Sequence, residues 1–221
     1  MEEVTILTSR QKKLLEFFAG SELAKHYYLT GGTALAAFHL KHRLSEDLDF
    51  FAQTAAPLEV VEKFCLDAAA KLGLKTPTLT RLYDRRIFIF QTETEELKVE
   101  FTEYPYNQLY SMTTIDGINI DNVRDIAANK IMAIFDRFEP KDYIDLAVLL
   151  KQFTLKNMIN DAHKKFGIRI EPISFGAKLM LVEKLPVMPK MLIPLTKNQV
   201  VKRITAEAEK LKNQVLESLE R

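Results

Sequence analysis

The alternation of hydrophobic and polar positions gives the first part of the chain a mixed character. Short stretches of alternating polar and apolar residues, typical of half-buried strands, fall between helical patterns. The strands that we predict cover residues 26–30, 46–52, 78–84, 85–92 and 97–104, and the helices cover 10–19, 33–40 and 57–73. The last three strands are close in sequence and predict a β-meander, and residues 113–120 predict a small hairpin around Asp116–Gly117.

The second part of the chain has helical periodicity almost throughout. The predicted helices cover residues 125–138, 141–152, 155–166, 172–185 and 198–220, and Pro140 separates the first two. We therefore predict an α+β protein. A mixed sheet flanked by helices would occupy residues 1–120, and a helical bundle would occupy residues 121–221.

Composition is that of an ordinary soluble protein, with 47% hydrophobic and 28% charged residues in 221. No apolar run approaches the roughly 18 residues of a membrane span. The first residues also lack the basic-then-apolar order of a signal peptide. The single cysteine, Cys65, excludes an internal disulfide, and its apolar helical surroundings predict a buried, inert thiol. We expect a cytoplasmic protein with no membrane partner.

Charge is distributed unevenly along the chain. Residues 1–150 hold 17 Lys and Arg against 23 Asp and Glu, whereas residues 151–221 hold 14 against 7. The net charges are therefore −6 and +7. A basic region on an acidic body can bind a polyanion. A lysine-rich helical surface exposed to solvent would explain the same numbers.

Two glycines and a threonine, Gly31, Gly32 and Thr33, stand between a predicted strand and a predicted helix. Glycines let a ligand approach the backbone closely. The N-terminus of a helix offers free N–H groups and the positive end of its dipole, which suits a phosphate. The hydroxyl of Thr33 would add a donor. The alternative is a capping threonine after a flexible turn.

Three acids are expected on one face of the sheet. Asp47 and Asp49 are two residues apart in a strand, so they project to the same side. Glu100 alternates with the apolar residues of another strand. Clustered carboxylates repel one another unless a cation lies between them, and Mg²⁺ prefers oxygen ligands. Exposed strand acids without a ligand, with Glu100 paired to a neighbouring Lys or Arg, are the alternative.

The stretch LTGGTALAAFHLKHRLSEDLDFF, residues 29–51, resembles the signature of nucleotidyltransferases of the DNA polymerase β superfamily. That signature has a hydrophobic residue, Gly-Gly or Gly-Ser, about a dozen residues and then Asp-x-Asp. The stretch is more similar still to the AbiEii/AbiGii toxin family. Its Arg-x-Ser-x-Asp-x-Asp segment matches Arg43, Ser45, Asp47 and Asp49.

The resemblance resumes in residues 125–150. A helical Lys, an Arg about two turns on and a Lys-Asp-x-x-Asp element match Lys130, Arg137 and residues 141–145. Lys130 and Arg137 are seven residues apart and share a helix face, which suits neutralising phosphates. A solvated face with nearby acids as partners is the alternative.

By resemblance, Lys130 contacts the nucleotide phosphates, Arg43 can contact them too, and Asp142 is a further essential acid. The division of roles between Asp142 and Asp145 stays open.

The resemblance implies a nucleotidyltransferase that uses Mg²⁺ or Mn²⁺ and a nucleoside triphosphate. Asp47, Asp49 and Glu100 would be the catalytic acids and metal ligands, with Glu100 as third ligand or as base. The acceptor would be RNA such as tRNA, or a protein. A cognate antitoxin is the expected partner, because family members act as toxins. Two alternatives stay open: a nucleotide- or RNA-binding module without catalysis, and a transferase acting on a small molecule such as an antibiotic.

Overall fold

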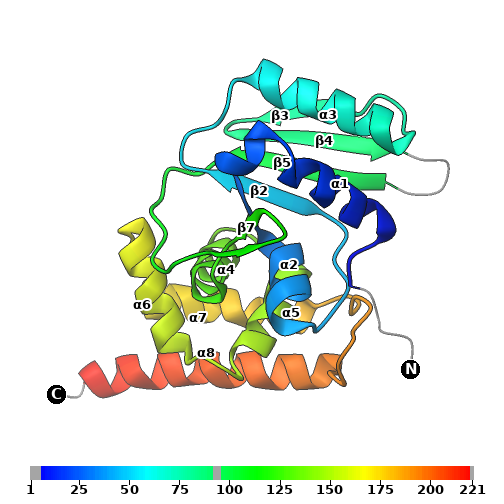
Figure 1. Cartoon of the computed structure of the whole chain (residues 1–221). Coiled ribbons are helices and arrows are strands. Elements are labelled where there is room, and N and C mark those ends of the chain that lie inside the picture. The colour runs from blue at the N-terminus through cyan, green and yellow to red at the C-terminus, as the bar shows by residue number, and fades with distance from the viewer. Residues whose placement is uncertain (1–5, 92–95, 220–221) are drawn as a thin grey trace. The chain divides into compact units, whose positions relative to one another are not determined.

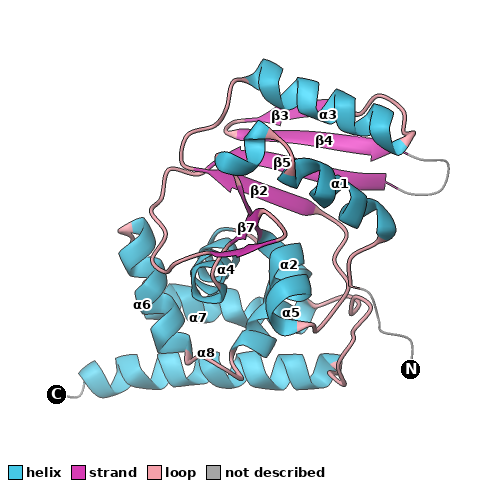
Figure 2. Ribbon diagram, in the orientation of Figure 1, coloured by secondary structure: helices cyan, strands magenta, loops and turns pink. Residues whose placement is uncertain are grey.

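A seven-stranded mixed sheet organises the N-terminal part of the chain, within the residues that the computed structural model describes, 6–91 and 96–219. The chain divides into two compact units, Met1–Asn122 and Val123–Arg221. Strands occur in the first unit, and the described part of the second is helical (Figure 2). The α+β class predicted from the sequence is confirmed.

The sheet has the strand order β3-β4-β5-β2-β1-β7-β6. β2 pairs in parallel with β5, and β1 pairs in parallel with β7, whereas the other neighbours are antiparallel. The predicted meander is therefore present as β3, β4 and β5. The strands are β1 (Tyr28–Thr30), β2 (Leu48–Ala52), β3 (Thr78–Leu82), β4 (Arg85–Gln91), β5 (Glu96–Glu103), β6 (Thr113–Ile115) and β7 (Ile118–Ile120).

The helices of the first unit are α1 (Ser9–Ala19), the 3₁₀ turn η1 (Glu22–Lys25), α2 (Gly31–Ala34), the π-helical η2 (Leu35–Leu40) and α3 (Leu58–Leu72). α1 begins with a capping box, in which the side chains of Thr8 and Gln11 each accept from the other's backbone N–H. The predicted helix over 33–40 starts two residues earlier than expected, at the glycines. The turn η1 had no counterpart among the sequence predictions.

Helices α1 and α3 lie together over one face of the sheet (Figure 1). Their aromatic side chains meet those of the central strands there. The ring of Phe18 lies 4.1 Å from that of Phe50, which in turn lies 5.1 Å from Phe101. Because successive strand residues face opposite sides, Asp49 and Glu100 lie on the other face. Cys65 is buried in α3, and burial raises the pKa of its thiol, as expected for an inert residue.

The second unit contains α4 (Val123–Asp136), α5 (Pro140–Leu149), α6 (Leu155–Phe166), α7 (Pro172–Met180), the 3₁₀ turn η3 (Leu181–Lys184) and α8 (Lys197–Leu219). All five predicted helices are present. α8 packs on α7 and α5, and Arg203 donates to the carbonyl of Ala147 at 2.6 Å. Between α4 and α6, the Lys165 ammonium lies 2.8 Å from the Asp125 carboxylate, and both side chains are fully buried. No helix among the described residues is long and apolar enough to cross a membrane.

Candidate active site

The glycine turn after β1 packs tightly against side chains from residues 43–49. Gly31 has a φ of +71°, in the left-handed region that favours glycine, and a Cβ there would overlap the carboxylate of Asp49. A Cβ on Gly32 would lie 2.7 Å from Nη2 of Arg43. The two glycines therefore let the turn approach Asp49 and Arg43, whatever further role they have toward a ligand.

Thr33 and Arg43 support this turn from inside. The Thr33 side chain is fully buried, and its hydroxyl donates to the carbonyl oxygen of Asp47. Arg43 is 1% exposed, and its Nη1 donates to the carbonyl of Leu44 at 3.0 Å. The hydroxyl of Thr33 is thus already used within the protein. Direct contact of either side chain with a phosphate stays a prediction.

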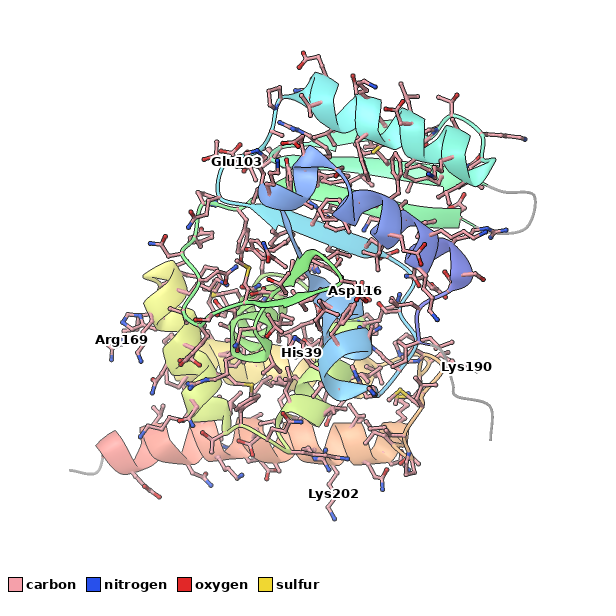
Figure 3. The ribbon with its side chains drawn as sticks, in the orientation of Figure 1. His39, Glu103, Asp116, Arg169, Lys190 and Lys202 are labelled. Carbon is pink, nitrogen blue, oxygen red and sulfur yellow. The ribbon has the colours of Figure 1, made fainter. Side chains whose placement is uncertain are left out.

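The end of β1 is also fixed to the end of β7. The hydroxyl of Thr30 donates to Oδ2 of the buried Asp121 at 2.6 Å. Nε2 of His39, labelled in Figure 3, lies 2.8 Å from the carbonyl oxygen of Asp121. Burial lowers the pKa of His39, so the neutral ring that donates to this carbonyl is favoured. Sequence reasoning missed Asp121, because its partners are distant in sequence.

The three predicted acids lie in adjacent positions on the sheet. Asp49 is the direct neighbour of Glu100 in the parallel pairing of β2 with β5. Asp47 comes immediately before β2, and its side chain is 41% exposed. Leu48 and Phe50 alternate with these acids and are fully buried on the other face. The structure therefore brings Asp49 and Glu100 together and places Asp47 at the start of the same row, which we call the acid row.

Two cations accompany the acid row. Arg85 of β4 binds Glu100 in a fork, with Nε 2.5 Å from Oε1 and Nη2 2.6 Å from Oε2. Lys98 of β5 has its ammonium 3.6 Å from Oδ2 of Asp47 and 3.4 Å from Oε2 of Glu100. Glu100 is thus paired with neighbouring cations, as in the alternative considered from the sequence.

These contacts shift the acid–base properties of the row. Burial alone would raise the pKa of Glu100, but the hydrogen bonds and charge of Arg85, helped by Thr102 and Lys98, lower it below its ordinary value of 4.5. Burial would lower the pKa of Lys98, yet the charges of Asp47, Asp49 and Glu100 together raise it. Glu100 and Lys98 are therefore both charged at neutral pH.

Asp47 and Asp49 have the chemistry of magnesium ligands, since both are partly exposed carboxylates on one side of the chain. Glu100 fits less directly, because Arg85 holds both of its oxygens. In the described ranges 6–91 and 96–219, no three Asp, Glu, His or Cys side chains are grouped so as to hold a metal ion. Asp47 and Asp49 therefore fit a divalent metal ion, whereas Glu100 would have to release Arg85 before it could bind one.

The second unit places Lys130 in a buried ion-pair cluster. Its ammonium donates to Oδ1 of Asp142 at 2.5 Å and lies 2.8 Å from Oδ2 of Asp145, which is fully buried. Arg137 follows α4 directly, is 55% exposed, and lies 3.5 Å from Oδ2 of Asp142. The Lys-Asp-x-x-Asp element thus supplies two acids that hold Lys130, which is buried and does not lie on the solvated face considered as the alternative.

Sequence reasoning missed Arg85 and Lys98 as members of the site. Lys98 shares the polar positions of its strand with Glu100, and Arg85 stands at the start of β4. The register of β4 with β5 brings Arg85 to Glu100, and the register of β5 with β2 brings Lys98 to Asp47. A register between distant strands leaves no local mark in the sequence.

A glycine turn beside paired aspartates is the arrangement that the sequence predicts for a nucleotidyltransferase. The profile of the AbiEii family, described as nucleotidyl transferase AbiEii toxins of type IV toxin–antitoxin systems, matches residues 13–213. The chain therefore belongs to the AbiEii family, and the predicted family and enzyme class are confirmed.

One relative is similar in sequence, and two solved structures are similar in fold. The uncharacterized protein aq_aa25 of Aquifex aeolicus (strain VF5) is 30% identical over 164 residues, which cover 72% of this chain and 76% of that protein. The crystal structure of JHP933 from Helicobacter pylori shares the fold, with a TM-score of 0.58 and 21% identity over 96% of this chain and 95% of that one. MenT4, the nucleotidyltransferase toxin Rv2826c from Mycobacterium tuberculosis H37Rv, also shares the fold. Its TM-score is 0.56, and it is 18% identical over 91% of this chain and 81% of that one.

Proposed function

We propose that this nucleotidyltransferase moves a nucleoside monophosphate from a nucleoside triphosphate to an RNA, in a reaction that depends on Mg²⁺ or Mn²⁺. The observation that carries the proposal is the packing of Asp49 directly against Gly31. This packing places the glycine turn, which suits a phosphate, beside the acid row, which suits a metal ion. A phosphate at the turn would thus lie beside the acids that hold its metal ion.

Phosphate binding and metal binding would fall to different residues of the chain. The backbone N–H groups at Gly31 and Gly32 would bind phosphate oxygens, and Asp47 and Asp49 would hold the metal. The metal ion would neutralise charge on the phosphates and stabilise the leaving group. The resemblance to the family assigns Lys130 to the nucleotide phosphates, and within the second unit its ammonium is held by Asp142 and Asp145. The acceptor hydroxyl would attack the α-phosphorus in line, and pyrophosphate would leave.

Glu100 has two candidate roles, and its electrostatics favour one. A general base works best with a pKa near the working pH. The pKa of Glu100 is lowered, because Arg85 more than offsets the effect of burial. We therefore propose that Glu100 is a third metal ligand, reached when Arg85 gives up at least one hydrogen bond, and not the base.

The acceptor proposed is RNA because residues 151–221 are strongly basic. In the second unit, Arg169, Lys190 and Lys202 are exposed and point away from the ribbon (Figure 3). A groove of about 660 Å³ between the end of α5, α6 and α8 is bordered by Lys151, Lys156 and Lys210. Phosphates of an RNA strand would find several cations within this unit. As in other toxins of the family, a cognate antitoxin is the proposed partner in the cell.

The test uses the purified protein with each of the four α-labelled nucleoside triphosphates, Mg²⁺, and total cellular RNA and protein. We expect label in an RNA band with one preferred nucleotide. Asp47→Asn should abolish labelling, whereas the exposed Asp67→Asn should not. Full transfer by Asp47→Asn would refute the mechanism, and label in a protein band would refute the RNA acceptor.

One observation favours a second candidate. Because Arg85 and Lys98 already neutralise much of the acid row, the protein could bind a nucleotide without transferring it. Metal-dependent nucleotide binding, with no labelled product from RNA, protein or aminoglycosides, would establish that function. Labelling of an aminoglycoside alone would establish a small-molecule transferase.

A further inference from the structure

Lys98 occupies the place in the acid row where a cation is needed. Its ammonium lies between Asp47 and Glu100, at 3.6 and 3.4 Å. It reaches this position from within the row, because Lys98 and Glu100 are two residues apart on β5 and share a face. Its side chain is 29% exposed, so the ammonium is neither buried in the core nor free in solvent.

Lys98 is the cation that the structure places against Asp47. Arg85 is committed to Glu100 by its fork. Lys98 therefore supplies most of the compensation for Asp47. A divalent ion bound by Asp47 would stand close to this ammonium, and like charges at such distances repel strongly outside bulk water.

We propose that Lys98 is a resident counter-cation of the acid row, and that a divalent metal ion binds at Asp47 and Asp49 only by displacing its ammonium. The inference rests on the proposed metal dependence and adds that the chain itself competes with the metal. Lys98 would thus keep metal affinity low until a nucleotide brings further negative charge. Lys98 is a positioning residue here, since it acts through Asp47.

The test measures Mn²⁺ binding without nucleotide, by the electron paramagnetic resonance signal of free Mn²⁺. Lys98→Met keeps the apolar stem and removes the charge, and we expect about tenfold tighter Mn²⁺ binding. Lys63→Met is the matched control, because Lys63 is exposed and pairs with Asp67 at 2.7 Å away from the row. It should leave the Mn²⁺ affinity unchanged. Adding Asp47→Asn to Lys98→Met should remove the gain.

Equal or weaker Mn²⁺ binding by Lys98→Met would overturn the inference. That result would be expected if Lys98 served only to contact a nucleotide phosphate. A second measurement uses the unaltered protein, in case the variant does not fold. Acetylation of Lys98 by an amine reagent, followed by mass spectrometry, should become faster when Mn²⁺ is saturating, and an unchanged or slower rate would also overturn the inference.

These outcomes are separable from those of the transfer assay. Tighter Mn²⁺ binding by Lys98→Met, in a protein that labels no acceptor, would support the counter-cation and refute the proposed reaction. Normal transfer by the unaltered protein, with no change in Mn²⁺ affinity on Lys98→Met, would support the proposed reaction and refute the counter-cation.

Discussion

Substitution of Gly31 by alanine tests the contact between the glycine turn and the acid row. Alanine at a φ of +71° costs about 1–2 kcal/mol in backbone energy. Its Cβ would also overlap the Asp49 carboxylate, and overpacking of this kind costs about 1–3 kcal/mol. We therefore expect Gly31→Ala to lower the free energy of unfolding by about 2–5 kcal/mol, measured by urea denaturation followed by circular dichroism.

Gly73 provides a matched control in the same unit. Its φ is +66°, but a Cβ there would meet nothing within 4 Å. Gly73→Ala should therefore cost only the backbone energy, about 1–2 kcal/mol. The difference between the two variants isolates the clash with Asp49.

A double-mutant cycle with Asp49→Ala completes this test. Removing the carboxylate should reduce the cost of Gly31→Ala to near that of Gly73→Ala, with a coupling energy of about 1–3 kcal/mol. Gly31→Ala should also lose nucleotide transfer, because Asp49 must move. If the two glycine variants cost the same and the cycle shows no coupling, the glycine is not there to accommodate Asp49, and the reasoning fails.

Three further expectations follow from the charged clusters. Lys130→Ala should lower the free energy of unfolding by about 3–5 kcal/mol, because it removes the ammonium that two buried carboxylates share. A loss below about 1 kcal/mol in urea denaturation would contradict this. The lowered pKa of Glu100 means that its contribution to stability is present above pH 4.5 and is lost as the pH falls through the folded-state value. Urea midpoints of Arg85→Ala should thus depend less on pH in the acid range than those of the unaltered protein, and equal dependence would count against the pair. Replacing Lys151 and Lys156 by Glu should weaken RNA binding and lessen its salt dependence, as measured by fluorescence anisotropy at several salt concentrations, and an unchanged slope would exclude this groove.

Much of the fold could be predicted from the sequence, since it follows from local patterns. Alternation marked β2 and β5, and helical periodicity marked every helix of the second unit. The short turn η1 was missed because it has no periodicity of its own. The helix after the glycines was placed two residues late, because Gly31 and Gly32 predict a turn by propensity while the structure uses them as its first residues.

The candidate site was predictable only as a set of residue types. The acids, the glycines and Lys130 could be named from spacing and resemblance. Their partners could not, because the register between strands decides that Arg85 reaches Glu100, and helix packing decides that Asp145 reaches Lys130. Tertiary packing also buries the side chains of Thr33 and Arg43, which the sequence alone does not reveal.

The parallel pairing of β2 with β5 has a consequence for how the site comes into being. Asp49 and Glu100 are direct neighbours, yet about fifty residues of chain separate them. Pairings between such distant strands form slowly, because the chain must lose the entropy of closing a large loop before any contact stabilises the pairing. A nascent chain, or a fragment that stops short of β5, carries Asp47 and Asp49 without Lys98 or Glu100. The complete acid row is therefore expected to form late in folding, and it should be lost as a whole when β5 detaches.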